Sequence, residues 1–331
     1  MLPHSLSADF LALPKAELHL HLEGSIEPST VTELAARHGE TVTEQEARAR
    51  YSYTDFAGFI DAFKWVTSYL RGPEDFALIT RRLAERLLAQ NVVYAELTLS
   101  VGVMLWRKQS AEANFEAMLR AAEAFSRQGL RLRWIFDVTR QFGAEPALRV
   151  AEVSAQYAGE GVVAFGMGGD ELSIPAEEFR EAYDYAAEHG LHRLVHAGEI
   201  GGPQEIRDAI ELLGAERIGH GISAMHDPAL QDLLAERQIP LEICPTSNLC
   251  TAALAKQLAR DSAAITDHPL PALLRRNLPI VLSSDDPAMF HTSLLGEYSA
   301  ADAMGLSEEE LRRLLAMSFE HAFDGPPPIE D

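Results

Sequence analysis

Hydrophobic and polar residues alternate strictly over a short stretch near the start of the chain, from Glu17 to Leu22. In an extended strand this alternation places His19 and His21 on one face and the intervening leucines on the other. Gly24 follows the stretch and lets the backbone bend where the strand ends. The pattern predicts a strand that presents two imidazole side chains side by side.

Beyond residue 90 the chain alternates between short β-rich runs and longer amphipathic runs. Strands are predicted at residues 91–99, 132–138, 162–168, 192–197, 217–221, 240–245 and 279–285. Helices, several beginning with proline, are predicted at residues 111–128, 146–158, 175–189, 203–213, 228–237 and 269–276. With the opening strand this makes eight strand–helix units, which favour an α/β fold of the closed (β/α)8 TIM barrel type. No Gly-x-Gly-x-x-Gly follows the first strand, which disfavours a dinucleotide-binding sheet.

A helical insertion is expected after the first strand, over residues 26–90, where it would cap the barrel. Its predicted helices cover residues 28–38, 54–71 and 73–90. The second carries an aromatic and aliphatic face that suits either core packing or the roof of a pocket: Phe56, Phe59, Ile60, Phe63, Trp65, Val66 and Tyr69. Residues 306–323 are predicted as a last helix, before Gly325 and three prolines. The whole chain, 1–331, is expected to form one domain.

Composition and charge narrow the classes of partner. Hydrophobic residues make up 47% and charged residues 24% of the 331 residues, as in ordinary globular proteins. The net charge of −22 would repel nucleic acids and anionic membranes. The two cysteines, Cys244 and Cys250, are too few for a disulfide framework, and no signal peptide or membrane span is recognised. We therefore expect a cytoplasmic protein; its oligomeric state cannot be read from the sequence.

Residues suited to metal binding and acid–base chemistry fall at three predicted strand ends. They occur in His196-Ala197-Gly198-Glu199, in Gly219-His220-Gly221 and in Ser283-Ser284-Asp285-Asp286. In a (β/α)8 barrel the carboxyl ends of all strands meet on one face, where active sites lie. The sequence thus predicts that these side chains meet His19 and His21 at one site.

The set His19, His21, His220 and Asp285 supplies three nitrogen ligands and one oxygen ligand, which suits one Zn²⁺ per chain. Bound zinc lowers the pKa of a water from 15.7 to about 7. Glu199, if buried, would stay protonated as a general acid, and His196 would orient the nucleophile or accept its proton. Asp286 would be free to bind substrate. We assign structural roles to His226, His268 and His291.

The same residues match a known family. The chain resembles the adenosine/adenine deaminases of the amidohydrolase superfamily, from residue 14 to about residue 290. The matching motifs are Pro14-Lys15-Ala16-Glu17-Leu18-His19-Leu20-His21-Leu22-Glu23-Gly24-Ser25, His196-Ala197-Gly198-Glu199, Arg217-Ile218-Gly219-His220-Gly221, Cys244-Pro245-Thr246-Ser247-Asn248 and Ser283-Ser284-Asp285-Asp286-Pro287.

The resemblance implies a hydrolase with one zinc ion that replaces the 6-amino group of a purine by oxygen and releases ammonia. It implies that His19, His21, His220 and Asp285 bind zinc and that His196 activates the attacking hydroxide. Glu199 would protonate N1, Asp286 would bond N7, and the backbone N–H of Gly169 would donate to N3; His21 and Glu23 would also contact the substrate.

The chain departs from the family's pattern at two places. Glu23 stands where adenosine-specific members have aspartate, as in adenine-specific and several divergent members. The fourth strand reads Phe165-Gly166-Met167-Gly168-Gly169 in place of Asp-Leu-Ala-Gly. The segment from Phe290 to Tyr298 looks more like that of nucleoside-type members, so we favour an adenosine-type nucleoside as substrate. Adenine and 5′-modified nucleosides such as aminodeoxyfutalosine are the alternatives.

Other functions have weaker support. Two-metal amidohydrolases need a modified lysine at the end of strand four, and the only lysines are Lys15, Lys64, Lys108 and Lys256. A non-catalytic purine- or metal-binding relative would be expected to have lost Glu199 or a ligand. Deaminases of nucleic acids carry His-x-Glu and Pro-Cys-x-x-Cys, which this sequence lacks.

Overall fold

The computed structural model describes residues 6–325, which form a nearly closed barrel of eight parallel strands in sequential order. Each strand pairs with the next along the chain, as a (β/α)8 barrel requires. The predicted fold class is therefore confirmed. The strands are β1 Lys15–His21, β2 Val92–Leu99, β3 Arg131–Thr139, β4 Val162–Gly168, β5 His192–Ala197, β6 Arg217–His220, β7 Leu241–Ile243 and β8 Ile280–Leu282.

A β-bulge interrupts the alternation that we predicted for β1. The pairing of β1 with β2 shifts between Glu17 and Leu20, so β1 carries one residue more than β2 there. Leu18 consequently packs with Ala16, apart from the main core that contains Leu20 and Leu22. The prediction that all three leucines share one face was wrong, because an extra residue re-aims the side chains around it.

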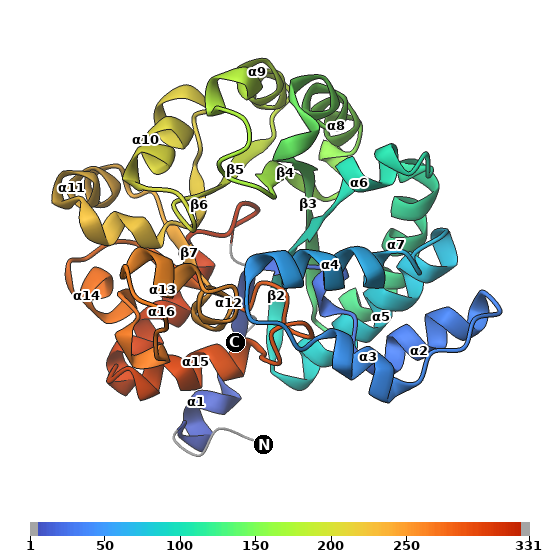
Figure 1. Ribbon diagram of the computed structural model, residues 1–331, viewed down its shortest axis with the longest axis horizontal. Coiled ribbons are helices and arrows are strands. Elements are labelled where there is room, and N and C mark those ends of the chain that lie inside the picture. The colour runs from blue at the N-terminus through green and yellow to red at the C-terminus, as the bar shows by residue number, and fades with distance from the viewer. Residues whose placement is uncertain (1–5, 326–331) are drawn as a thin grey trace.

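Helices surround the barrel in the view of Figure 1. They are α1 Ala8–Ala12, α2 Pro28–Arg37, α3 Glu44–Arg50, α4 Phe56–Thr67, α5 Pro73–Ala89, α6 Val101–Trp106, α7 Ala111–Ser126, α8 Ala144–Gln156, α9 Arg180–Glu188, α10 Pro203–Leu212, α11 Pro228–Arg237, α12 Pro245–Cys250, α13 Ala253–Gln257, α14 Leu270–Arg275, α15 Leu294–Ala303 and α16 Glu308–Glu320. Among the described residues, no helix is both long enough and apolar enough to span a lipid bilayer.

Local sequence explains where the helices begin. Proline occupies the first turn of α2, α5, α10 and α11, where its missing N–H costs no hydrogen bond. Asp55 caps α4 by accepting a hydrogen bond from the Gly58 N–H at 2.8 Å. Ser307 and Glu310 form a capping box at α16, the observed form of the helix predicted at 306–323. The three prolines after Gly325 lie outside the described residues.

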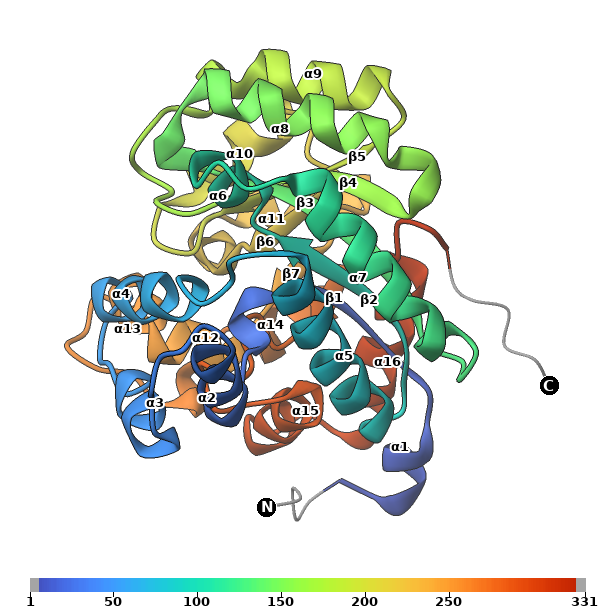
Figure 2. The same ribbon diagram turned by 90° about the vertical axis from the view of Figure 1, so that its right-hand side faces the viewer.

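The helices between β1 and β2 lie in two places. In Figure 2, α2, α3 and α4 lie along the left-hand edge of the molecule, opposite α1 and α16. By contrast, α5 packs against β2 and α7 in the outer ring of helices. The α4 helix contributes side chains to a cavity at the mouth of the barrel.

A buried charge network lies inside the barrel. The Arg217 guanidinium is 1% exposed and contacts Glu96 at 2.5 Å and Glu242 at 2.6 Å. It also donates to the His321 carbonyl oxygen at 2.9 Å and lies 3.6 Å from the centre of the Phe323 ring. One cation therefore neutralises two buried carboxylates and ties the C-terminal segment to the barrel.

We predict that Arg217→Met destabilises the protein by about 3–5 kcal/mol, because two carboxylates are left buried without their counter-ion. Urea unfolding of the two proteins measures the difference. The control is Arg275→Met, which removes an exposed arginine that pairs with Glu310 at the surface. A loss for Arg217→Met no larger than that of the control would contradict the role of the network.

Candidate active site

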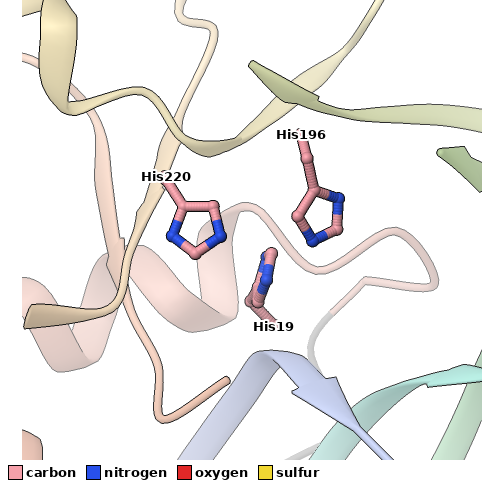
Figure 3. Close-up of side chains that lie close together, drawn as sticks. All are labelled: His19, His196 and His220. Carbon is pink, nitrogen blue, oxygen red and sulfur yellow. The ribbon is translucent and has the colours of Figure 1, made fainter. Parts of the chain in front are cut away.

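Three histidines from different strands converge at the carboxyl end of the barrel, as Figure 3 shows. His19 comes from β1, His196 from β5 and His220 from β6. The His19 ring centre lies 4.7 Å from that of His196 and 5.0 Å from that of His220. His21, also on β1, lies beside them, with its Nε2 3.3 Å from the His196 Nε2.

The backbone after β8 brings Asp285 to the same point. The His21 N–H donates to the Asp285 carbonyl oxygen at 2.9 Å, and the Asp285 N–H donates to the His19 carbonyl oxygen at 3.1 Å. The Asp285 Oδ1 lies 3.4 Å from the Nε2 atoms of both His19 and His21, and its Oδ2 lies 3.9 Å from the His220 Nε2. The four predicted ligands therefore meet.

Hydrogen bonds fix which nitrogen of His19 faces this centre. Its Nδ1 lies 2.6 Å from a Glu242 carboxylate oxygen, to which it donates a hydrogen bond, so Nε2 is the nitrogen that faces the centre. Burial alone would raise the pKa of Glu242, but Arg217 and His19 outweigh it and hold that pKa below its usual value, so the carboxylate stays charged. The His19 Nε2 is buried and has no hydrogen-bond partner among the described residues. An orphaned nitrogen facing further imidazoles and a carboxylate fits a zinc-type cation.

Two of the four predicted ligands hold an unusual backbone conformation. His220 has φ of 60° and Asp285 has φ of 63°, both in the left-handed region that non-glycine residues seldom occupy. Such a conformation costs about 1–3 kcal/mol per residue and persists only where the surroundings impose it. Its presence at both residues indicates a functional requirement for the placement of these side chains.

Glu199 lies next to this cluster, in the loop that follows β5. Its Oε2 is 3.6 Å from the His220 Nε2, and its Oε1 accepts a hydrogen bond from the Thr251 hydroxyl at 3.3 Å. Burial, together with the nearby negative charge of Asp285, raises the pKa of Glu199 to about 8. A pKa of about 8 favours the protonated form of this carboxyl group at neutral pH.

The loop that carries Glu199 is anchored from two sides. The Glu171 carboxylate accepts hydrogen bonds from the N–H groups of Gly198, Ile200 and Gly201. The Gln257 side-chain amide donates to the Glu199 carbonyl oxygen at 2.9 Å. The sequence analysis missed Glu171, because its role depends on contacts between the segments that follow β4 and β5.

His196 has a defined tautomer. Its Nδ1 lies 3.0 Å from the Met167 carbonyl oxygen, which can only accept a hydrogen bond, so the neutral ring carries its proton on Nδ1. Burial lowers the pKa of His196 well below its usual value, and the neighbouring histidines lower it further. A neutral His196 thus presents its unprotonated Nε2 to the site, 3.3 Å from the His21 Nε2.

Asp286 is buried beside the cluster and depends on Gly24. Burial, reinforced by the charge of Asp285, raises the pKa of Asp286 well above its usual value, so its carboxyl group can donate a hydrogen bond. A Cβ atom at Gly24 would overlap the Asp286 carboxyl group. Gly24 does not have a positive φ. The backbone does turn at Glu23–Ser25, just after β1, but glycine is required at position 24 to leave space for Asp286.

The two other predicted substrate contacts lie in different surroundings. Gly169 has φ of 92°, which favours glycine, and it lines the cavity in front of the cluster. Glu23 is buried and accepts a hydrogen bond from the Ser100 N–H at 3.0 Å, and burial raises its pKa to about 7. Glu23 is not among the residues that line the cavity.

Several polar residues around the site were missed in the sequence. Asn248 hydrogen-bonds His220 Nδ1 at 3.2 Å and His268 at 3.2 Å. Asp137, at the end of β3, lines the cavity and accepts a hydrogen bond from the Gly168 N–H at 2.9 Å. Asp137 and Glu242 share one signal, a polar residue within an apolar strand, whereas Asn248 lies in α12 and has no such signal.

The site opens into one cavity of about 480 Å³. Its inner wall holds His21, His196, His220, Glu199, Asp285 and Asp286. Its outer wall comes from α4, α6 and the segment after β3. A cavity of this size suits a drug-sized ligand, of which a bare purine base would fill only part.

Comparisons with known proteins agree with this geometry. The family model described as "Adenosine deaminase" matches residues 14–326. An aminodeoxyfutalosine deaminase of Streptomyces coelicolor is 41% identical, over 98% of this chain and 84% of its own length. An adenine deaminase of the same organism is 35% identical, over 95% and 91%. The crystal structure of an adenine deaminase from Arthrobacter aurescens superposes with a TM-score of 0.86 at 31% identity, covering 94% of each chain.

The match spans nearly the whole barrel, including every strand that contributes to the site. These relatives are hydrolases that act on purines, as we expected from the motifs. The chain belongs to the adenosine deaminase family.

Proposed function

We propose that this protein is a zinc-dependent deaminase of an adenine nucleoside with a large 5′ substituent, of the aminodeoxyfutalosine kind. The observation that carries the proposal is the cavity in front of the clustered histidines, whose inner wall holds the predicted site residues and whose volume exceeds that of a purine base. The relative that bears the name aminodeoxyfutalosine deaminase also shares more residues with this chain than the adenine deaminase does. This substrate is one of the alternatives named from the sequence, and it replaces the adenosine-type nucleoside that we favoured there.

In the proposed reaction, water adds to C6 of the adenine ring, the C6–N bond breaks, and ammonia leaves a 6-oxo purine. His19, His21, His220 and Asp285 would hold the zinc ion, which would supply a nucleophile at neutral pH by lowering the pKa of a water to about 7. The orphaned His19 Nε2 supports this ligand set.

The remaining side chains have separate roles. The protonated Glu199 gives its proton to ring N1 as the nucleophile approaches. Protonation of N1 lowers the energy barrier to addition at C6, a step that disrupts the aromaticity of the ring. His196 accepts a proton from the attacking water through its free Nε2. Asp286 donates a hydrogen bond to N7, and the Gly169 N–H donates to N3, so that the ring is held on both edges.

Adenine is the second candidate substrate. Glu23 stands where adenosine-specific members carry aspartate. In addition, one solved structure that is similar to this chain, at 31% identity, is that of an adenine deaminase. Glu23 does not line the cavity, however, so it is placed to support the site and not to select against a sugar.

The proposal is tested by ultraviolet assays of the purified protein with adenine, adenosine and aminodeoxyfutalosine. We expect the kcat/KM for aminodeoxyfutalosine to exceed that for adenosine by about tenfold or more, since the additional contacts contribute binding energy. Turnover of adenine alone would reject the nucleoside substrate, and turnover of none of the three would reject the function.

Replacing one predicted ligand tests the metal site. We expect His21→Ala to lower the zinc content, measured by mass spectrometry of the metal, from about one ion per chain to a small fraction. His226→Ala is the matched control, since it removes an exposed histidine outside the cavity. Full zinc content in His21→Ala would remove His21 from the ligand set.

Glu199→Gln separates proton donation from metal binding. The amide keeps the shape of the side chain but cannot protonate N1, so we expect unchanged zinc content and a kcat about 10²–10⁴-fold lower. Glu211→Gln, on the exposed face of α10, is the control. Turnover of Glu199→Gln at the rate of the control would exclude Glu199 as the proton donor.

A further inference from the structure

Asp137 lines the cavity, but the proposed reaction gives it no role. It lies near the carboxyl end of β3, on the face of the barrel that carries the site, and is only 7% exposed. Within residues 6–325, no ion pair neutralises it. Because burial of a carboxyl group costs free energy unless its oxygens find partners, the contacts of Asp137 need an explanation.

One hydrogen bond joins Asp137 to the strand that supports His196. The Asp137 Oδ1 accepts a hydrogen bond from the Gly168 N–H at 2.9 Å. The carbonyl group of the same peptide bond belongs to Met167, and its oxygen accepts a hydrogen bond from the His196 Nδ1–H at 3.0 Å. The two hydrogen bonds therefore lie at opposite ends of one planar peptide group. Through this rigid unit, a contact made by Asp137 reaches His196.

This peptide group transmits both direction and strength. Because it is planar, holding its N–H toward Asp137 also holds its C=O toward His196. Hydrogen bonds in a chain polarise one another, so an N–H that donates makes the carbonyl oxygen of the same group a stronger acceptor. Asp137 thus favours the His196 tautomer that carries its proton on Nδ1 and leaves Nε2 unprotonated.

The segment that receives this hydrogen bond has little restraint of its own. It ends in Gly168 and Gly169, and glycine has more backbone freedom than any other residue. A Cβ atom at Gly168 would lie 3.1 Å from the Asp137 Oδ2 and 3.4 Å from the His196 ring. Glycine therefore leaves the space that the carboxyl group and the imidazole share, and Asp137 restrains the backbone that glycine leaves free.

The position of Asp137 also accounts for a departure of this chain from the family's pattern. Gly166 stands where Asp-Leu-Ala-Gly has its aspartate, and Gly166 is the register partner of Asp137 on the neighbouring strand. A Cβ atom at Gly166 would lie 3.9 Å from both the Cβ and the Oδ1 of Asp137. Side chains at the two positions would therefore compete for one space. In this chain the carboxyl group at that place comes from β3 and not from β4.

We infer that Asp137 is a positioning residue for His196, acting through the Met167–Gly168 peptide group. It accepts a hydrogen bond from the Gly168 N–H and so holds the Met167 carbonyl oxygen against the His196 Nδ1–H. The consequence for turnover rests on the proposed function, because that proposal makes His196 the proton acceptor. The chain of hydrogen bonds itself does not depend on it.

The neutral carboxyl group is sufficient for this role. Burial raises the pKa of Asp137 to about 8, which favours the protonated form at neutral pH. A neutral carboxyl group keeps a carbonyl oxygen that accepts a hydrogen bond from the Gly168 N–H. Asparagine has the same shape and the same acceptor. Asp137→Asn should therefore preserve the chain of hydrogen bonds, whereas Asp137→Ala and Asp137→Leu should break it.

The first test is steady-state kinetics with the best substrate among adenine, adenosine and aminodeoxyfutalosine. We expect Asp137→Ala and Asp137→Leu to lower kcat about 10–100-fold and to change KM less than about threefold, because a misplaced catalytic group slows the reaction and not binding. Zinc content should stay unchanged. Asp137→Asn should keep most of the kcat. Leucine nearly fills the volume of aspartate, so Asp137→Leu serves if Asp137→Ala does not fold.

The matched control is Asp75→Ala. Asp75 is also a buried aspartate that accepts a backbone hydrogen bond, from the Arg71 N–H at 2.9 Å, but it lies outside the cavity. Its replacement should leave kcat unchanged.

The second test does not depend on turnover. Nuclear magnetic resonance of protein labelled with a heavy nitrogen isotope in its histidines distinguishes protonated from unprotonated ring nitrogens, and His196→Gln identifies the His196 signals. We expect a protected His196 Nδ1–H in the unaltered protein, in Asp137→Asn and in Asp75→Ala. In Asp137→Leu its exchange with water should become about tenfold faster, since the support of about one hydrogen bond is lost.

The two measurements separate the inference from the proposed function. An Nδ1–H exchange rate in Asp137→Leu equal to that in Asp75→Ala would overturn the positioning role, even if kcat falls. A kcat for Asp137→Leu equal to that of the control would overturn its consequence for turnover. Equal losses in Asp137→Asn and Asp137→Leu would overturn the role of the neutral acceptor. If the unaltered protein deaminates none of the three purines, the proposed function fails, and the exchange rates still decide whether Asp137 positions His196.

Discussion

The backbone hydrogen bonds between β1 and Asp285 are the constraint on which the site depends. They join residues 19–21 to residue 285 and so close the barrel at its carboxyl end. Glu17 adds to this closure, because its carboxylate accepts hydrogen bonds from the N–H and hydroxyl groups of Ser284. Without these hydrogen bonds, the predicted ligands on β1 and the predicted ligand Asp285 would lie on two unconnected edges of a sheet. No cation could then contact both edges.

The site is also supported from below by charges that the barrel buries. The sequence of contacts runs from His19 to Glu242, then to Arg217 and Glu96. Each buried charge has an opposite partner, which buried ions require because desolvation is costly. The network orients His19 through Glu242, so a residue inside the barrel sets the direction of a nitrogen at its mouth. Stability and ligand geometry therefore depend on the same few side chains.

The sequence was sufficient for the fold class and for the residues that meet at the site. Periodicity predicts the strands well, and the strand-end rule brings His196, His220 and Asp285 together. The sequence was insufficient to predict the roles of Glu242, Asn248 and Glu171. Their partners depend on contacts between segments that are distant in the chain. The bulge in β1 and short helices such as α6 were also missed, because one inserted residue or six helical residues leave no periodic signal.

The distance along the chain between the joined segments has a consequence for biosynthesis. A ribosome makes β1 well before its partner at residue 285 and before His321 and Phe323, which cover Arg217. During translation the nascent β1 strand has an open edge, which exposes it to aggregation or to chaperones. A cation that contacts both β1 and Asp285 could therefore bind only after residue 285 has emerged from the ribosome.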